Sequence, residues 1–170
     1  MATPGVRHPL LVARTHNMQN LETKIPAPVV AIVVGSFMKL YAWMAQISID
    51  NSSTLAEVGI RLSQLSAVIA ILAFASFGVA RTTINPLDPS RASTLVTGGV
   101  FRITRNPMYL SLLLLLVAYA VRLGSLVEWL GPALFVSYVT RFQIIPEERI
   151  LAMKFGSAFL DYKDRTRRLI

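Results

Sequence analysis

The sequence predicts an all-α integral membrane protein, a helical bundle of about four transmembrane helices followed by a C-terminal amphipathic cytosolic helix. Three observations support this fold class. Of the 170 residues, 54% are hydrophobic and 15% are charged, whereas soluble domains carry roughly a quarter charged residues. The apolar residues gather in runs that suit a hydrocarbon core about 30 Å thick. The basic residues gather between those runs, which is typical of a chain oriented in a bilayer.

The chain divides into two parts. Residues 1–26 are polar and slightly basic, and they lack the central apolar run of a secretory signal. We expect a polar N-terminal segment there, with a natural translation start at Met18 as an alternative. Residues 27–170 are expected to form a single membrane domain.

Two long apolar runs predict the first two spans. Residues 27–49 contain one charge, at Lys39, and residues 62–80 contain none. Residues 46–59 are expected to connect them. Lys39 is expected to extend toward the interface or face a neighbouring helix, with a place beside a polar cavity as the alternative.

The second half contains a polar loop and two shorter runs. Residues 81–105 are rich in proline and glycine, and ordered loops of this length tend to be functional. An apolar run then lies between Arg105 and Arg122, and another extends from Trp129 to Thr140. With a turn around Gly124, these runs predict a closely packed hairpin of short or tilted helices, or a re-entrant hairpin.

The basic residues predict the orientation. Of the 17 Lys and Arg residues, 14 lie in the N-terminal segment, the central loop and the tail. Four crossings put these segments on one face, which the positive-inside rule makes cytosolic. We expect a multi-pass protein with both termini in the cytosol, in the inner membrane if the source is bacterial. This bias also explains the net charge of +8 without nucleic acid as a partner.

The tail predicts one more helix. Pro146 followed by two acids has the form of a helix start. An apolar stripe then recurs at helical spacing, which indicates an amphipathic helix against the bundle or the lipid headgroups. The stripe consists of Leu151, Phe155, Phe159 and Tyr162. The terminal KDRTRR reads as an anchor to anionic membrane lipid.

A few residues are candidates for chemistry. Glu147 and Glu148 are adjacent beyond the last run, where they either cap a helix or attract a cationic ligand. The loop enters the third run through GGVFRITRNPMY, which composition alone marks as an ordinary boundary. The chain has no cysteine, and both histidines lie in the N-terminal segment. We therefore expect no metal site.

The segments TTINPLDPSRASTLVTGGVFRITRNPMYLSLLLLL and RFQIIPEERILAMKFGSAFLDYKDRTRR resemble the isoprenylcysteine carboxyl methyltransferase family and its relatives among the phospholipid N-methyltransferases. The resemblance covers residues 80–168 approximately. It implies a membrane methyltransferase that uses S-adenosylmethionine at the cytosolic face. The implied acceptor is a lipophilic small molecule or a lipid, methylated on oxygen or nitrogen.

The resemblance also implies the site residues. The catalytic residues would be Glu147, Arg105 and Tyr109. The cofactor-binding residues would be Gly98, Gly99, Arg105, Asn106, Tyr109, Glu147, Glu148 and Tyr162. Asn106 stands where the family usually has histidine, and an amide cannot titrate. Gln143 stands where carboxyl-methylating members have arginine, so this position does not favour a carboxylate acceptor.

Two other functions stay open at this point. Membrane sterol reductases share a similar C-terminal half and bind NADPH, although they generally have more spans. A non-catalytic membrane protein that retained the fold is the second alternative. Oligomeric state is open as well, since short spans can bury polar positions against a second copy in a homo-oligomer.

Overall fold

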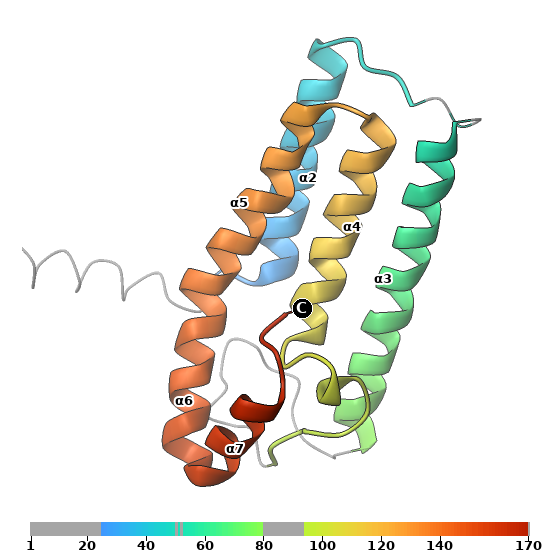
Figure 1. Cartoon of the computed structure of the whole chain (residues 1–170). Coiled ribbons are helices and arrows are strands. Elements are labelled where there is room, and N and C mark those ends of the chain that lie inside the picture. Colours follow the sequence, from blue (N-terminus) through green and yellow to red (C-terminus); the bar gives the residue numbers. More distant parts are fainter. Residues whose placement is uncertain (1–24, 50, 52, 80–93, 170) are drawn as a thin grey trace, which may run out of the picture.

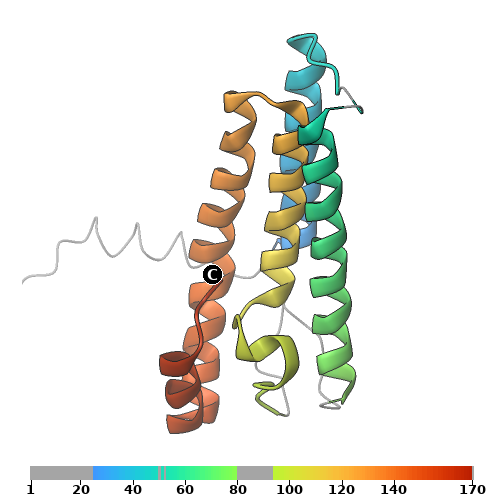
Figure 2. The same ribbon diagram turned by 45° about the vertical axis from the view of Figure 1, so that its right-hand side comes forward.

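The structure is a computed structural model that describes residues 25–49, 51, 53–79 and 94–169. These residues form helices and contain no extended strand, which confirms the helical fold class. The long elements are α2 (Ala27–Met44), α3 (Thr54–Val79), α4 (Pro107–Leu123), α5 (Leu130–Val139), a π-helical segment η4 (Thr140–Ile144), α6 (Ile145–Phe155) and α7 (Ser157–Arg165). Two short 3-10 turns are η2 (Gly99–Arg102) and η3 (Leu126–Trp129). Helices α2 to α5 lie alongside one another, and α7 folds back beside α6 (Figures 1 and 2).

Helices α2 and α3 are both long and apolar enough to cross a membrane. Most of their apolar side chains are exposed, as lipid-facing helices require. Helix α3 begins at Thr54, eight residues before the predicted start of the second span. Glu57, which lies in the predicted connection, forms an exposed pair with Arg61 one turn further along this helix, at 3.9 Å. Such an i,i+4 pair is compatible with a helix, so these charges did not mark its end.

Helix α4 packs closely against α3. A Cβ atom at Gly59 would lie 2.8 Å from the Ala118 carbonyl oxygen, so only glycine permits this approach. The Ser66 hydroxyl donates a hydrogen bond of 2.7 Å to the Ser111 carbonyl across the same interface. Helix α4 ends at Leu123 and is followed by Gly124, whose φ of 66° gives the left-handed cap that glycine favours. The predicted turn at Gly124 is therefore confirmed.

The predicted helix start at Pro146 is wrong. The backbone stays helical from α5 through η4 into α6, and Figure 1 shows these segments as one rod. Proline lacks an amide hydrogen and normally disrupts a helix interior. Here the preceding turn is π-helical, a local widening that commonly occurs within α-helices. Glu147 and Glu148 therefore follow a helix that has already formed and do not cap a free N-terminus.

The single amphipathic tail helix is also corrected. Gly156, with φ 53°, separates α6 from α7 and turns the chain back toward the start of α4. The apolar stripe still serves packing, because Phe159 and Tyr162 are buried with Phe101 while Leu151 and Phe155 pack against them. Residues 1–24 and 80–93, which hold both histidines and most of the predicted central loop, lie outside the described residues.

Candidate functional site

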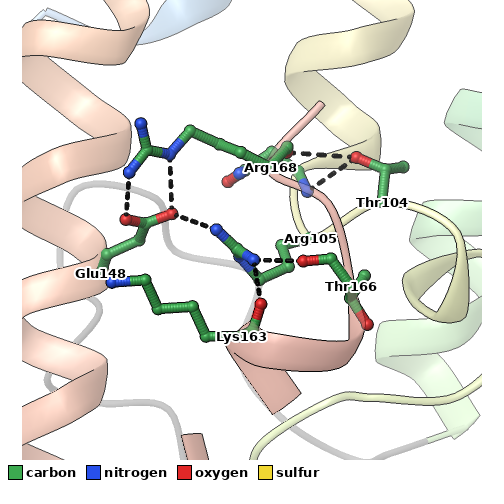
Figure 3. A network of polar contacts seen from close by, with 7 residues as sticks. Thr104, Arg105, Glu148, Lys163, Thr166 and Arg168 are labelled. Carbon is green, nitrogen blue, oxygen red and sulfur yellow. Dashed lines mark hydrogen bonds and ion pairs between the residues drawn. The ribbon is translucent and has the colours of Figure 1, made fainter. Parts of the chain in front are cut away.

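The site forms where the start of α4 meets α6 and the residues that follow α7. Segments more than 40 positions apart converge there, and Figure 3 shows their polar contacts. A single β-bridge between Thr104 and Arg167 fixes the last residues beside the entry of α4. The backbone N–H of Arg105 donates to the Arg167 carbonyl at 2.9 Å, which strengthens this junction.

Arg105 is the centre of the polar network. Its side chain is 8% exposed, and its Nη2 donates to Glu148 Oε1 at 3.0 Å. Its Nη1 donates to the Lys163 carbonyl at 2.8 Å and to the Thr166 carbonyl. The guanidinium group therefore ties α4, α6 and the tail together. Its Nε is buried and has no hydrogen-bond partner within the described part of the chain.

Glu148 is held between two arginines. In addition to the contact with Arg105, its Oε1 accepts from Arg168 Nε at 3.0 Å and its Oε2 accepts from Arg168 Nη2 at 2.8 Å. Burial alone would raise the pKa of Glu148, but the hydrogen bonds and charges of Arg168 and Arg105 outweigh burial and lower it. Glu148 is therefore an ionised structural group. Arg168 is engaged with Glu148, although its side chain is 40% exposed, and the predicted lipid anchor in the tail stays a prediction.

Glu147 has a different environment although it is the next residue. Its carboxyl group accepts a hydrogen bond from the Tyr109 hydroxyl. Burial raises the pKa of Glu147 from its ordinary value to about 7; the hydrogen bond from Tyr109 opposes this shift, and the charge of Glu148 adds to it. A carboxyl with this pKa is half-protonated near neutral pH, which suits proton transfer.

Two cavities meet at Glu147. The first has a volume of about 210 Å³ and the second about 140 Å³. Five residues line both cavities: Phe77, Phe101, Arg105, Asn106 and Glu147. The first cavity continues between apolar residues of α2, α3 and α4, including Pro28, Phe74 and Leu112. The second continues toward the tail, and its further lining residues are Thr94, Leu95, Val96, Glu148, Leu151, Phe159 and Tyr162.

Two other predicted residues belong to this site. Tyr162 donates from its hydroxyl to the Phe101 carbonyl at 2.7 Å. Burial raises the pKa of Tyr162 to about 12, although the charge of Arg105 opposes the shift. Asn106 donates from Nδ2 to the Arg168 carbonyl at 2.8 Å. Both side chains are therefore oriented by backbone groups rather than by other side chains.

The two predicted glycines lie elsewhere. Gly98 and Gly99 line a separate cavity beside the end of α3, and neither lines the cavities at Glu147. Gly99 has φ 59°, and a Cβ atom there would lie 2.9 Å from Ser76 Oγ. Its role in the structure is to form the turn that leads to Phe101. The described residues contain no group of three or more side chains suited to hold a metal ion.

Sequence reasoning missed Arg168 and Thr104. The Thr104 hydroxyl donates to the Arg168 carbonyl at 3.2 Å and accepts from the Asn106 backbone N–H at 3.2 Å. The basic tail resembled a membrane anchor, and nothing local distinguished Arg168 from its neighbours. The one available signal was Glu148, a carboxylate beside the predicted membrane edge that needed a cation from another segment.

Comparisons with known proteins identify the family of the chain. The phospholipid methyltransferase family matches residues 55–158, from α3 to the start of α7. A protein of Haemophilus influenzae described as an uncharacterized protein is 46% identical over 61 residues, which cover 36% of this chain and 97% of that protein. No solved structure matches. The family match includes Arg105, Asn106, Tyr109 and both glutamates, and it covers more than half of the chain. The chain therefore belongs to the phospholipid methyltransferase family.

Proposed function

We propose that the protein transfers a methyl group from S-adenosylmethionine to an amine on a lipophilic acceptor, at the cytosolic face of the membrane. One observation carries this proposal. Glu147, with a pKa near neutrality, lies on the wall shared by an apolar cavity and a more polar one. Transfer between two ligands requires two adjoining sites with a common reacting point, and this arrangement supplies them.

The second cavity has groups that suit the cofactor. The buried Nε of Arg105 is a donor without a partner in the described structure, and it suits the carboxylate of a zwitterionic amino-acid group. Phe101, Phe159 and Tyr162 offer aromatic surface for a nucleobase. When bound, S-adenosylmethionine supplies an activated methyl group whose carbon–sulfur bond breaks as the new carbon–nitrogen bond forms.

The first cavity favours an amine over a carboxylate acceptor. Arg105 is the only basic residue among the described residues that line it, and its guanidinium group is already engaged with Glu148 and two backbone carbonyls. Glu147, in contrast, pairs among the described residues with the neutral hydroxyl of Tyr109. Its carboxylate attracts an ammonium group, while the apolar walls suit acyl chains that enter from the bilayer.

Glu147 would act as the general base. An ammonium group must lose a proton before its nitrogen can accept a methyl group, and the Glu147 carboxylate takes this proton. The Tyr109 hydroxyl keeps the carboxyl group oriented toward the shared wall. Apolar residues such as Phe74 and Leu112 exclude water, so the base meets the acceptor rather than bulk solvent. The second cavity offers the proton a route to the cytosol.

The proposal also includes an arrangement of the helices in the membrane. Helices α2, α3, α4 and the α5 part of the long helix would cross the bilayer, with both termini in the cytosol and the inner membrane as the location if the source is bacterial. The short α4 and α5 would cross with the help of Glu128 and Arg122 near the opposite interface. The site would then lie at the cytosolic membrane surface.

The test is a transfer assay with purified full-length protein. Labelled S-adenosylmethionine and a total lipid extract should yield a labelled amine-containing lipid, and Glu147→Gln should abolish the label. Binding of S-adenosylhomocysteine and of NADPH is measured in parallel. NADPH binding without S-adenosylhomocysteine binding would refute the proposal in favour of a reductase, and binding of neither would favour a non-catalytic protein.

A further inference from the structure

A third cavity lies along α2 and α4, with Ser63 of α3 at its side. Its volume is about 460 Å³. Its lining residues are Pro28, Ala31, Ile32, Gly35, Lys39, Ser63, Leu112, Leu115, Leu116, Tyr119 and Arg122. On both helices these positions recur every three or four residues, so one continuous face of each helix forms the wall. We call this cavity the α2–α4 groove.

The α2–α4 groove is apolar over most of its length. Pro28 and Leu112 line its first end and also line the cavity at Glu147. Gly35 leaves the groove open because it has no side chain; an added Cβ atom there would lie 3.7 Å from Leu116 Cδ2. From Pro28 to Lys39 the helix rises about 16 Å. This length is close to half of a hydrocarbon core about 30 Å thick, so the groove suits an acyl chain of one leaflet.

The far end of the groove is basic. Lys39 and Arg122 both line it, together with Tyr119, and none of the described lining residues is acidic. Arg122 is fixed in place because its side chain fills the space left by Gly59, where an added Cβ atom would lie 2.2 Å from Arg122 Cγ. Its Nη2 donates to Asn51 Oδ1 at 3.2 Å. Its Nε is buried and has no hydrogen-bond partner among the described residues.

We propose that the α2–α4 groove binds an anionic phospholipid of the leaflet opposite the Glu147 site. The lipid phosphate contacts Lys39, Arg122 and the Tyr119 hydroxyl, and one acyl chain lies along the groove toward Leu112. Two cations at one end and an apolar wall of single-leaflet length match a lipid with an anionic headgroup better than a zwitterionic one. The inference rests on the membrane arrangement proposed above but does not depend on methyl transfer.

The experiment measures lipid binding by native mass spectrometry of the full chain, delipidated in detergent. Phosphatidylglycerol and phosphatidylcholine with the same acyl chains are added in turn. Lys39→Gln and Arg122→Gln should each lower phosphatidylglycerol affinity at least fivefold. Arg61→Gln is the matched control, because Arg61 is an exposed cation nearby on α3 that does not line the groove. Gly35→Leu should lower binding of both lipids by filling the groove, whereas Gly78→Leu should not, since Gly78 has nothing within 4 Å.

Several outcomes would overturn the inference. Equal affinity of the protein for the two lipids would contradict the proposed preference for an anionic headgroup. If Arg61→Gln lowered phosphatidylglycerol affinity as much as Lys39→Gln or Arg122→Gln, the preference would reflect general charge attraction and not binding in the groove. If the protein bound palmitate but did not bind phosphatidylglycerol, the groove would be a site for a free fatty acid. Because Lys39 is exposed, its substitution keeps the test valid even if Arg122→Gln fails to fold. Binding of S-adenosylhomocysteine should be unchanged in Lys39→Gln, which separates this inference from the proposed enzyme activity.

Discussion

Glu147 and Glu148 are neighbours in the chain, yet substitution by glutamine should change stability in opposite directions. Burial raises the pKa of Glu147 to about 7, whereas the pKa of Glu148 is lowered by two arginines. Glutamine is close in size to glutamate and retains an acceptor oxygen. The two substitutions therefore remove charge with little change in packing.

The expected effect at Glu147 follows from linkage. Between its ordinary pKa of 4.5 and about 7, the folded state holds a proton that the unfolded state has lost. Folding is therefore weakened as pH rises through this window, and the loss is complete above it. The shift corresponds to an upper limit of about 3 kcal/mol at pH 8 and less than about 1 kcal/mol at pH 5. Glu147→Gln abolishes this penalty and should be more stable than the wild type at pH 8.

Glu148→Gln should do the reverse. A lowered pKa means that the ionised carboxylate contributes stability above its ordinary pKa, and this stability is lost as pH falls through the lowered value. Removing the charge leaves Arg105, whose side chain is 8% exposed, without its counter-ion. The expected cost is roughly 2 to 4 kcal/mol at pH 8, reduced because Arg168 is partly exposed.

The assay is thermal unfolding of both variants and the wild type in one detergent, at pH 5 and pH 8. Glu147→Gln should raise the midpoint at pH 8 by several degrees and change it much less at pH 5. Glu148→Gln should lower the midpoint at pH 8. If Glu147→Gln were as stable as or less stable than the wild type at pH 8, the raised pKa would be refuted and Glu147 could not be the neutral-range base.

Two further substitutions test the site and the packing. Tyr109→Phe removes the hydrogen bond that lowers the Glu147 pKa, so the pH profile of kcat/KM should move to higher pH with little change in cofactor KM; an unmoved profile would argue against Glu147 as the base. Gly59→Ala should destabilise the protein by about 2 kcal/mol or more in chemical unfolding, because its Cβ atom would overlap Arg122. Gly78→Ala, on the same helix with open space around it, is the control and should be nearly neutral or slightly stabilising.

The sequence was sufficient where periodicity and local chemistry decide the structure. The apolar runs predicted α2, α4 and most of α3, and the turn at Gly124 followed from glycine alone. The resemblance to a family predicted that Arg105, Tyr109, Glu147 and Glu148 belong together. The structure joins them in two neighbouring hydrogen-bonded pairs, Arg105 with Glu148 and Tyr109 with Glu147.

The rest depended on contacts between distant segments. Glu147 and Glu148 have different roles because their partners differ: Tyr109 contacts Glu147, and Arg168 contacts Glu148. Neither partner is near the glutamates in sequence. Pro146 was misread because a proline after an apolar run normally marks a helix start, whereas a π-helical turn accommodates it inside a longer helix. Such a turn leaves no signature in residue type.

The π-helical turn at Thr140–Ile144 also sets the rotational phase between the two ends of the long helix. Each residue of a regular α-helix advances the side-chain direction by about 100°. If residues 140–144 were a regular α-helix, Glu147 would be rotated about the helix axis relative to α5. With α5 packed as it is, the Glu147 side chain would then point away from Tyr109. The wider turn absorbs that rotation, so α5 and the acid-bearing α6 can each keep their own orientation. A one-residue deletion inside this turn should consequently give a regular α-helix that keeps both faces in place.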